Sequence, residues 1–123
     1  MPLVTQLALP ASAIGVEPAM NENDYLDLVD ATLLDIETRI EAFDEDIDLE
    51  AGSGMLTVTL VNGSKVIINR QRPTQEIWVA ARSGGYHCGW RDGQWICNTT
   101  KEALAVLLRR VIAEQDGGDI QFA

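Results

Sequence analysis

Carboxylate side chains are concentrated in one part of the chain, between Glu22 and Glu50. That segment holds twelve Asp and Glu residues and one base, Arg39, so it carries −11, whereas the whole 123-residue chain carries −10. Carboxylate oxygens are hard ligands that suit Fe³⁺, Fe²⁺, Mn²⁺ and Ca²⁺ better than soft metals. Because the segment contains no His or Cys, it predicts an exposed, loosely held and exchangeable cation. An acidic run can also be a solvated surface or a docking surface for a basic protein.

Two adjacent elements are predicted to position these carboxylates. Apolar residues spaced three and four apart predict a helix from Asn23 to Phe43 with one buried stripe. Its members are Tyr25, Leu28, Val29, Thr32, Leu33, Ile36, Ile40 and Phe43. Strict alternation from Asp46 to Ala51 predicts a strand that turns Ile47 and Leu49 inward.

The predicted acidic edge of the helix lies beside the buried stripe, and the strand follows directly. At about 100° per residue, four helix carboxylates fall on one exposed edge, and consecutive elements are usually neighbours in space. We call the combined surface the acidic ridge and take it as the candidate metal-binding set. Its members are Asp30, Glu37, Glu41, Asp44, Glu45, Asp46, Asp48 and Glu50.

Composition excludes several classes of function. Net negative charge disfavours a nucleic-acid partner, and no run approaches the roughly 20 apolar residues of a membrane span. One His, His87, cannot build a two-His-one-carboxylate iron site, and two cysteines, Cys88 and Cys97, cannot hold an iron–sulfur cluster. We interpret both as reduced thiols in strands. The chain also lacks a Ser-His-Asp set and a phosphate-binding glycine loop, so we expect a binding protein and not an enzyme.

Residues 1–19 contain no Lys or Arg, and hence no basic region of a targeting peptide. We therefore expect a cytoplasmic protein, in which residues 1–19 form a disordered extension and residues 20–123 one folded domain.

The rest of the chain is typical of an antiparallel sheet followed by a helix. Strands are predicted at Met55–Val61, Lys65–Gln71, Glu76–Arg82, Tyr86–Trp90 and Gln94–Asn98. Asn62-Gly63 predicts a two-residue type I′ turn and Asp92-Gly93 another tight turn. Thr99 with Glu102 predicts a capping box for a second helix that buries Leu104, Leu107, Leu108, Val111 and Ile112 and ends at Gly117-Gly118. The fold class is therefore α+β, a two-layer α-β sandwich with N- and C-terminal helices packed on one face of an antiparallel sheet.

That arrangement leaves one face of the sheet open. In Glu76–Arg82, alternation places Ile77 and Val79 toward the helices and Trp78 on the open face, with Arg82 on the same parity. Trp78 could be an ordinary half-buried sheet aromatic. An exposed Trp flanked by amides and an Arg is also typical of a protein-contact hot spot.

Short motifs along the sheet carry a family resemblance. They are Ile68-Asn69-Arg70-Gln71-x-Pro73, Ile77-Trp78-x-Ala80, Gly84-Gly85-Tyr86-His87 and Asp92-Gly93-x-Trp95. In this order and spacing, after an acidic first helix, they resemble the bacterial frataxin (CyaY) family across residues 21–122.

The resemblance implies a function as well as the α-β sandwich. Iron, Fe²⁺ or Fe³⁺, would bind weakly and exchangeably on the acidic ridge, and the protein would modulate iron–sulfur cluster assembly by docking on a cysteine desulfurase and its scaffold protein. Asn69, Gln71 and Trp78 would contact that partner, with His87 near the same surface. Thr38 and Ala42 interrupt the acidic pairs usual in the family, and the loop after Phe43 looks short.

Two hypotheses of function remain. The first is an iron-binding regulator or iron donor of cluster assembly, monomeric without iron. The second is a metal-independent acidic protein-interaction module. Both predict partner binding that weakens with salt, but only the first predicts that iron on the ridge changes the rate of cluster assembly.

Overall fold

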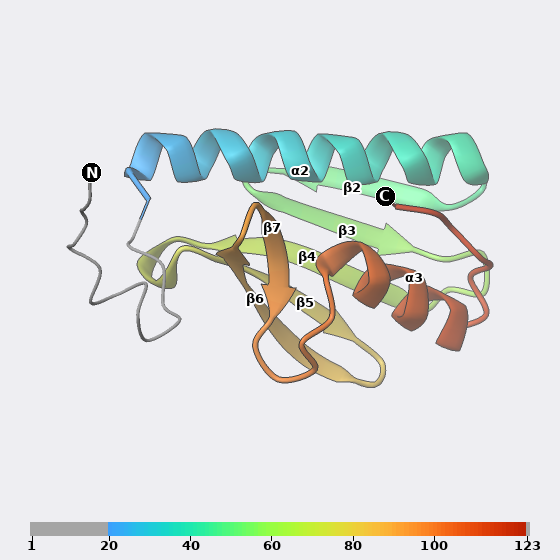
Figure 1. Ribbon diagram of the computed structural model, residues 1–123. Coiled ribbons are helices and arrows are strands. Elements are labelled where there is room, and N and C mark those ends of the chain that lie inside the picture. The colour runs from blue at the N-terminus through green and yellow to red at the C-terminus, as the bar shows by residue number, and fades with distance from the viewer. Residues whose placement is uncertain (1–19, 123) are drawn as a thin grey trace, which may run out of the picture.

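A computed structural model describes residues 20–122, in which a six-stranded antiparallel sheet is covered on one face by two helices (Figure 1). The predicted extension, residues 1–19, lies outside the described residues. In chain order the elements are α2 (Glu22–Phe43), β2 (Asp48–Gly52), β3 (Met55–Thr59), β4 (Lys65–Gln71), the 3₁₀ turn η1 (Arg72–Thr74), β5 (Glu76–Ala81), β6 (Gly84–Arg91), β7 (Gln94–Cys97) and α3 (Leu104–Glu114). Strand order in the sheet equals sequence order, β2 to β7. The predicted α+β sandwich is confirmed.

The core lies between the helices and the sheet, as the apolar periods predict. Five residues of the α2 stripe are buried: Tyr25, Val29, Leu33, Ile36 and Ile40. All five predicted α3 residues are buried as well. Phe43 was expected in the same stripe but is 45% exposed. It occupies the last turn of α2 and packs on the C-terminal segment, where a Cβ on Gly118 would lie 2.6 Å from Phe43 Cζ.

Alternation along the strands also holds. Leu56, Val58, Val66, Ile68, Ile77 and Val79 face the helices and are buried. Cys88 is buried on the same face, whereas its neighbour His87 is exposed on the open face. Within residues 20–122, no helix combines the length and the apolar character needed to cross a membrane.

The turn at Asn62-Gly63 differs from the prediction. The Gly63 N–H donates to the Leu60 carbonyl and the Leu60 N–H donates to the Ser64 carbonyl, both at 2.8 Å. Only Gly63, with φ of 90°, is left-handed in this loop. The connection is therefore a three-residue loop with a glycine bulge, not a two-residue type I′ turn. Consequently β3 ends at Thr59, before Val61, which is 68% exposed. Asp92-Gly93 does form the tight turn predicted, with φ of 50° and 80°.

The predicted capping box of the second helix is wrong. Its N-cap is Ala103, which makes no side-chain cap, and Glu102 instead pairs with Arg110 at 2.8 Å. The loop before α3 doubles back along β7, because the Cys97 N–H donates to the Glu102 carbonyl at 2.8 Å. At the other end α3 stops at Glu114. The first left-handed residue after it is Asp116, with φ of 62°, and Gly118, with φ of 102°, follows two residues later.

Gln115, just after α3, is a buried polar residue with partners on two distant loops. Its Nε2 donates to Ser64 Oγ at 3.0 Å and to the Lys65 carbonyl at 3.2 Å, and its Oε1 accepts from the Arg82 N–H at 2.8 Å. These bonds join the C-terminus of α3 to the β3–β4 and β5–β6 connections. Nothing in the local sequence pattern predicts them.

We expect Gln115→Ala to lower the free energy of unfolding by about 2 kcal/mol, because it removes a buried side chain and leaves a partly buried N–H and a partly buried carbonyl without their partners. Urea denaturation followed by circular dichroism measures the effect. Gln121→Ala is the matched control, since that residue is exposed and its change should stay within about 0.5 kcal/mol. Equal stability of the two variants would contradict this role.

Candidate functional site

One transverse row of side chains crosses the open face of the sheet. Met55 lies opposite Asn69, Asn69 opposite Trp78, and Trp78 opposite His87. We call Met55, Asn69, Trp78 and His87 the open-face row. The Trp78 and His87 rings are stacked, with centroids 4.0 Å apart and planes 6° from parallel. Met55 is 45% exposed, so the row offers apolar and aromatic surface to water.

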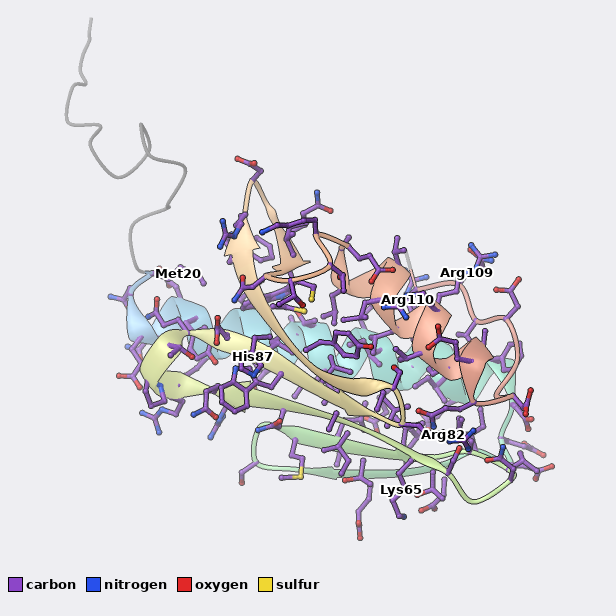
Figure 2. The ribbon with its side chains drawn as sticks, turned by 90° about the horizontal axis from the view of Figure 1, so that it is seen from below. Met20, Lys65, Arg82, His87, Arg109 and Arg110 are labelled. Carbon is purple, nitrogen blue, oxygen red and sulfur yellow. The ribbon has the colours of Figure 1, made fainter. Side chains whose placement is uncertain are left out.

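Two glycines of β6 flank this row on the open face. Gly85 lies opposite Ala80 and Gly89 opposite Glu76, so β6 contributes no side chains on either side of His87 on the open face. Figure 2 shows His87 along β6 and Arg82 at the far end of the β5–β6 hairpin. A broad partner surface could therefore approach the row without steric obstruction.

Beside the open-face row, on the same face of the sheet, lies a hydrogen-bonded carboxylate, Glu76. Its Oε1 accepts from Trp78 Nε1 at 2.8 Å and from Thr74 Oγ1 at 3.0 Å, and its Oε2 accepts from Asn98 Nδ2 at 2.8 Å. Burial alone would raise the pKa of the Glu76 carboxyl, but the bonds from Trp78, Asn98 and Thr74 outweigh it and lower that pKa. Glu76 thus fixes the indole orientation that permits stacking on His87.

Sequence reasoning missed Glu76 as a site residue. Glu76 lies two residues before Trp78, so both side chains are on the same face of β5. This spacing could have indicated that the two residues interact. Asn98, its partner from the end of β7, had no comparable signal.

Glu76→Gln is expected to lower the free energy of unfolding by about 1–2 kcal/mol at pH 7. The carboxylate accepts three bonds through two oxygens, whereas the amide has only one oxygen and cannot accept all three. The pKa of Glu76 is lower in the folded protein than its ordinary value of 4.5. The ionised carboxylate therefore stabilises the fold at pH values above 4.5, and this stabilisation is lost as the pH falls through the native pKa. The gap between wild type and variant should therefore narrow below pH 4.5. Urea denaturation across this pH range tests it, with exposed Glu45→Gln as the control. A gap independent of pH would argue against ionised Glu76 as the acceptor.

The predicted partner-contacting residues are only partly brought together. Asn69, Trp78 and His87 share the open-face row, and Gln71 lies opposite Glu76 in the next one. Trp78 is half-buried, not fully exposed, because it packs against His87. Arg82 does not flank Trp78 as expected. It follows the end of β5, where its backbone N–H binds Gln115.

The carboxylates of the acidic ridge fall into two groups. Asp30, Glu37 and Glu41 lie on α2. The opposite flank of that helix contacts β7 and the C-terminal segment, through the Trp95 Nε1 bond to Thr32 at 3.1 Å and the Arg39 bond to the Gln121 carbonyl at 3.4 Å. The acidic edge is therefore on the flank toward the edge strand β2.

The second group comes from β2 and the turn before it. The strand begins at Asp48, not at Asp46 as predicted, because Asp44 organises a turn there: its Oδ1 accepts from the Asp46 N–H at 2.9 Å. Asp48 lies opposite Thr59 and Glu50 opposite Thr57. Both therefore point to the open face, on the other side of the sheet from α2.

One base lies near a ridge carboxylate on the open face of the sheet. Thr59 pairs with Asp48 on one side and with Lys65 on the other, and Lys65 Nζ donates to Thr59 Oγ1 at 2.8 Å. The Lys65 ammonium group therefore comes from β4, two strands away from Asp48 on β2. In the described part of the chain, no three His, Cys, Asp or Glu side chains gather at a position that could hold a metal ion. Any iron on this surface would have to be shared among dispersed carboxylates.

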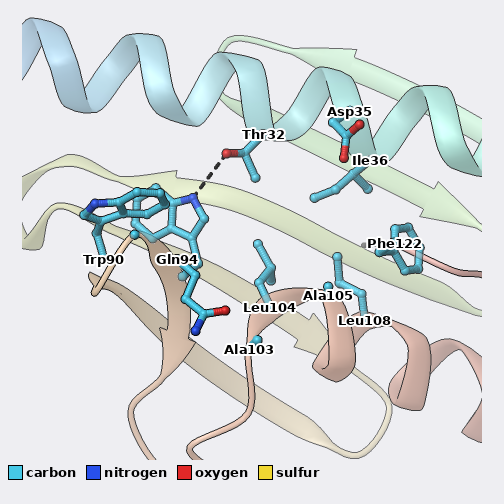
Figure 3. A pocket seen from close by; sticks show the side chains of 12 residues that line it. Thr32, Asp35, Ile36, Trp90, Gln94, Ala103, Leu104, Ala105, Leu108 and Phe122 are labelled. Atoms are coloured by element: carbon cyan, nitrogen blue, oxygen red, sulfur yellow. Dashed lines mark hydrogen bonds between the residues drawn. The ribbon is translucent and has the colours of Figure 1, made fainter.

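A groove of about 340 Å³ lies on the helix side, between α2, the β6–β7 hairpin and the start of α3 (Figure 3). Trp90 and Trp95 form one wall, with ring centroids 5.2 Å apart and planes at 69°. None of the predicted metal-binding or partner-binding residues lines it. The candidate site is thus a surface and not a cavity.

The model of the frataxin-like domain family matches residues 18–118. This chain belongs to the frataxin-like family. Its folded domain, sheet motifs and acidic first helix all fall within or beside that match, so the resemblance drawn from the sheet motifs is confirmed.

Individual relatives extend this family assignment. The iron–sulfur cluster assembly protein CyaY of Ectopseudomonas mendocina (strain ymp) is 42% identical over 106 residues, covering 85% of this chain and 96% of that protein. Frataxin from Psychromonas ingrahamii superposes with a TM-score of 0.78 at 30% identity, over 85% of this chain and 99% of that one. A trimeric frataxin from Saccharomyces cerevisiae, solved as a complex with ferrous iron, gives a TM-score of 0.58 at 26% identity, over 85% and 96%.

Proposed function

We propose that this frataxin-like protein acts in iron–sulfur cluster assembly, as an iron-binding regulator or iron donor that docks on a cysteine desulfurase–scaffold complex. The observation that carries the proposal is that two features share one surface. The open-face row crosses β3 to β6, and Asp48 and Glu50 lie on the same face of the sheet at its β2 edge. Iron bound there would be presented toward whatever docks on the row.

The chemistry of the ridge supports weak, exchangeable iron. Its ligands are carboxylate oxygens, most of them exposed, and hard iron cations accept such ligands. Exposed carboxylates in water attract a cation only modestly each, so several must contribute. Loose binding suits a donor or a sensor, which must release its ion.

The same-face arrangement also supports docking. Trp78, stacked on His87 and oriented by Glu76, is a preorganised aromatic anchor of the kind that dominates protein interfaces. The relative from Ectopseudomonas mendocina is named as an assembly protein, which favours partners in that machinery. We further propose that the protein is not an enzyme, that it resides in the cytoplasm and that it is monomeric without iron.

The alternative is a metal-independent acidic module. It is favoured by the absence, among residues 20–122, of a three-ligand set and by the position of Lys65 near Asp48. In that case the ridge would only steer a basic partner onto the sheet. The two proposals differ in whether iron bound to this protein changes the rate of assembly.

Reconstituted cluster assembly tests the proposal. Purified desulfurase, scaffold, cysteine and Fe²⁺ are mixed without oxygen, and sulfide release and cluster formation are followed separately, with wild type or with Asp48→Asn/Glu50→Gln. We expect wild type to change the rate in a manner that depends on Fe²⁺, and the double variant to bind the complex but lose that dependence. Equal effects of both proteins at all Fe²⁺ concentrations would favour the metal-independent module. Absence of binding and of any rate effect would refute the proposal.

A further inference from the structure

The two cysteines of the chain face each other across the β6–β7 pair. Cys88 lies directly opposite Cys97. In the adjoining pair, the Asn98 N–H donates to the His87 carbonyl at 2.8 Å. Bonded and non-bonded pairs alternate in an antiparallel ladder, so Cys88 and Cys97 form a non-hydrogen-bonded pair. Cα atoms in such pairs are about 4.5 Å apart, within the range that a disulfide spans.

Both thiols are unpaired and point into the helix-side layer of the molecule. Because they are directly cross-strand partners, their side chains lie on the same face of the β6–β7 pair. Cys97 Sγ also lies 3.5 Å from Thr99 Oγ1. The geometry therefore requires no rearrangement of the strands to bring the sulfurs together.

Cys97 lies directly beneath an exposed turn. Thr99, Thr100 and Lys101 are all exposed, and the turn is closed by the Lys101 N–H bond to the Cys97 carbonyl at 3.0 Å and the Cys97 N–H bond to the Glu102 carbonyl at 2.8 Å. Lys101 has a φ of 66°, an uncommon conformation for a residue other than glycine. Opening of this short turn would expose Cys97 without disturbing the sheet. Cys88 is buried on the interior side and does not lie under this turn, so opening the turn would not expose it in the same way.

The surroundings of the two thiols differ in a way that assigns them different roles. Burial would raise the pKa of Cys97, but hydrogen bonds from Thr100 and Thr99 outweigh it and bring that pKa to about 7. Burial and the adjacent Cys97 raise the pKa of Cys88 to about 12. Cys97 is therefore the nucleophile, and Cys88 the thiol that resolves the product.

We propose that Cys88 and Cys97 form a site of reversible oxidation, at which a peroxide converts the two thiols into a cross-strand disulfide. The Cys97 thiolate attacks one oxygen of hydrogen peroxide, breaking the O–O bond to give a Cys97 sulfenic acid and hydroxide. The Cys88 sulfur then attacks the Cys97 sulfur, and the sulfenic oxygen leaves as water with the Cys88 proton. In total both thiols are oxidised by two electrons and the peroxide is reduced. A dithiol reductant restores the thiols by exchange.

The experiment uses the full reduced chain and hydrogen peroxide, and it depends on neither iron nor a partner. Intact-mass spectrometry should show a loss of about 2 Da, peptide mapping should place the bond between Cys88 and Cys97, and dithiothreitol should reverse it. Dimedone present during oxidation should label Cys97 at least roughly ten-fold more than Cys88. In Cys88→Ala, the sulfenic acid should persist on Cys97, whereas Cys97→Ala should leave Cys88 unlabelled.

Wild type alone keeps the test decisive if either variant fails to fold. Oxidation that yields only intermolecular dimers, no loss of mass, or preferential dimedone labelling of Cys88 would overturn the proposal. So would disulfide formation only at urea concentrations that unfold the protein, because the native geometry would then play no part.

Discussion

Trp78→Ala is expected to weaken binding to the desulfurase–scaffold complex by about 2 kcal/mol or more, roughly 30-fold in Kd. Trp78 is the largest side chain of the open-face row, and its orientation is fixed by stacking on His87 and by the bond to Glu76. Truncation removes the anchor and leaves Glu76 with one donor fewer. Calorimetric titration of the complex with each variant measures the loss.

The cost of Trp78→Ala to the fold should be smaller, about 1 kcal/mol, because the side chain is only half-buried. Trp90→Ala is the matched control: it removes another half-buried Trp, which packs on Trp95 beside the groove on the helix side. That variant should bind the complex as wild type does. If Trp90→Ala weakened binding equally, or if Trp78→Ala bound normally while folded, the open face would not be the docking surface.

The second large effect is expected on iron. Replacing Glu41, Asp44 and Asp48 together by their amides should nearly abolish Fe²⁺ binding, whereas Glu41→Gln alone should reduce the affinity by only a small factor, since no single exposed carboxylate dominates. Asp44→Asn retains the Oδ1 that accepts from Asp46, so the turn before β2 is preserved. The triple variant should also melt at a higher temperature without metal, because repulsion within the ridge falls.

Anaerobic Fe²⁺ titration followed by NMR at matched ionic strength measures this loss. The charge-matched control is Asp24→Asn/Asp27→Asn/Asp116→Asn, which removes three exposed carboxylates outside the ridge and should bind iron as wild type does. Comparing Glu37→Gln/Glu41→Gln with Asp48→Asn/Glu50→Gln then separates the helix edge from the open face. Undiminished binding in the triple variant would refute the ridge as the iron site and direct attention to His87.

The elements predicted well are those in which a repeat in the sequence determines which face is buried. Residues 3.6 or 2 positions apart necessarily share a face, so the α2 stripe and the parity of Trp78 and Ile77 followed from the sequence alone. The predictions of the turn and of the helix cap were wrong because the same short sequence is compatible with several local backbone conformations. Asn62-Gly63 fits both the centre of a two-residue type I′ turn and the end of a three-residue bulged loop. Glu102 forms an ion pair with Arg110 and therefore does not cap the helix.

The site was harder to predict, because its partnerships join distant segments. Gln115 with Ser64 and Glu76 with Asn98 depend on how whole elements pack. The position of Lys65 near Asp48 depends on the register of three strands, β2, β3 and β4. Placement of Asn69, Trp78 and His87 in one row likewise needed the register, which alternation within single strands does not specify.

The strand order of the sheet also bears on how this chain reaches its native state. Every strand pairs with its neighbour in sequence, so each pairing closes a short loop at small entropic cost. The segment of α2 is different: Tyr25 donates to the Glu76 carbonyl across 51 residues, and Met20, just before the helix, donates to Gln75 across 55. Strand pairing can therefore precede the docking of α2, and the apolar residues of the sheet that α2 covers stay exposed to solvent until that helix docks. The rate of this last, long-range step determines how long the growing core is open to contact with other chains.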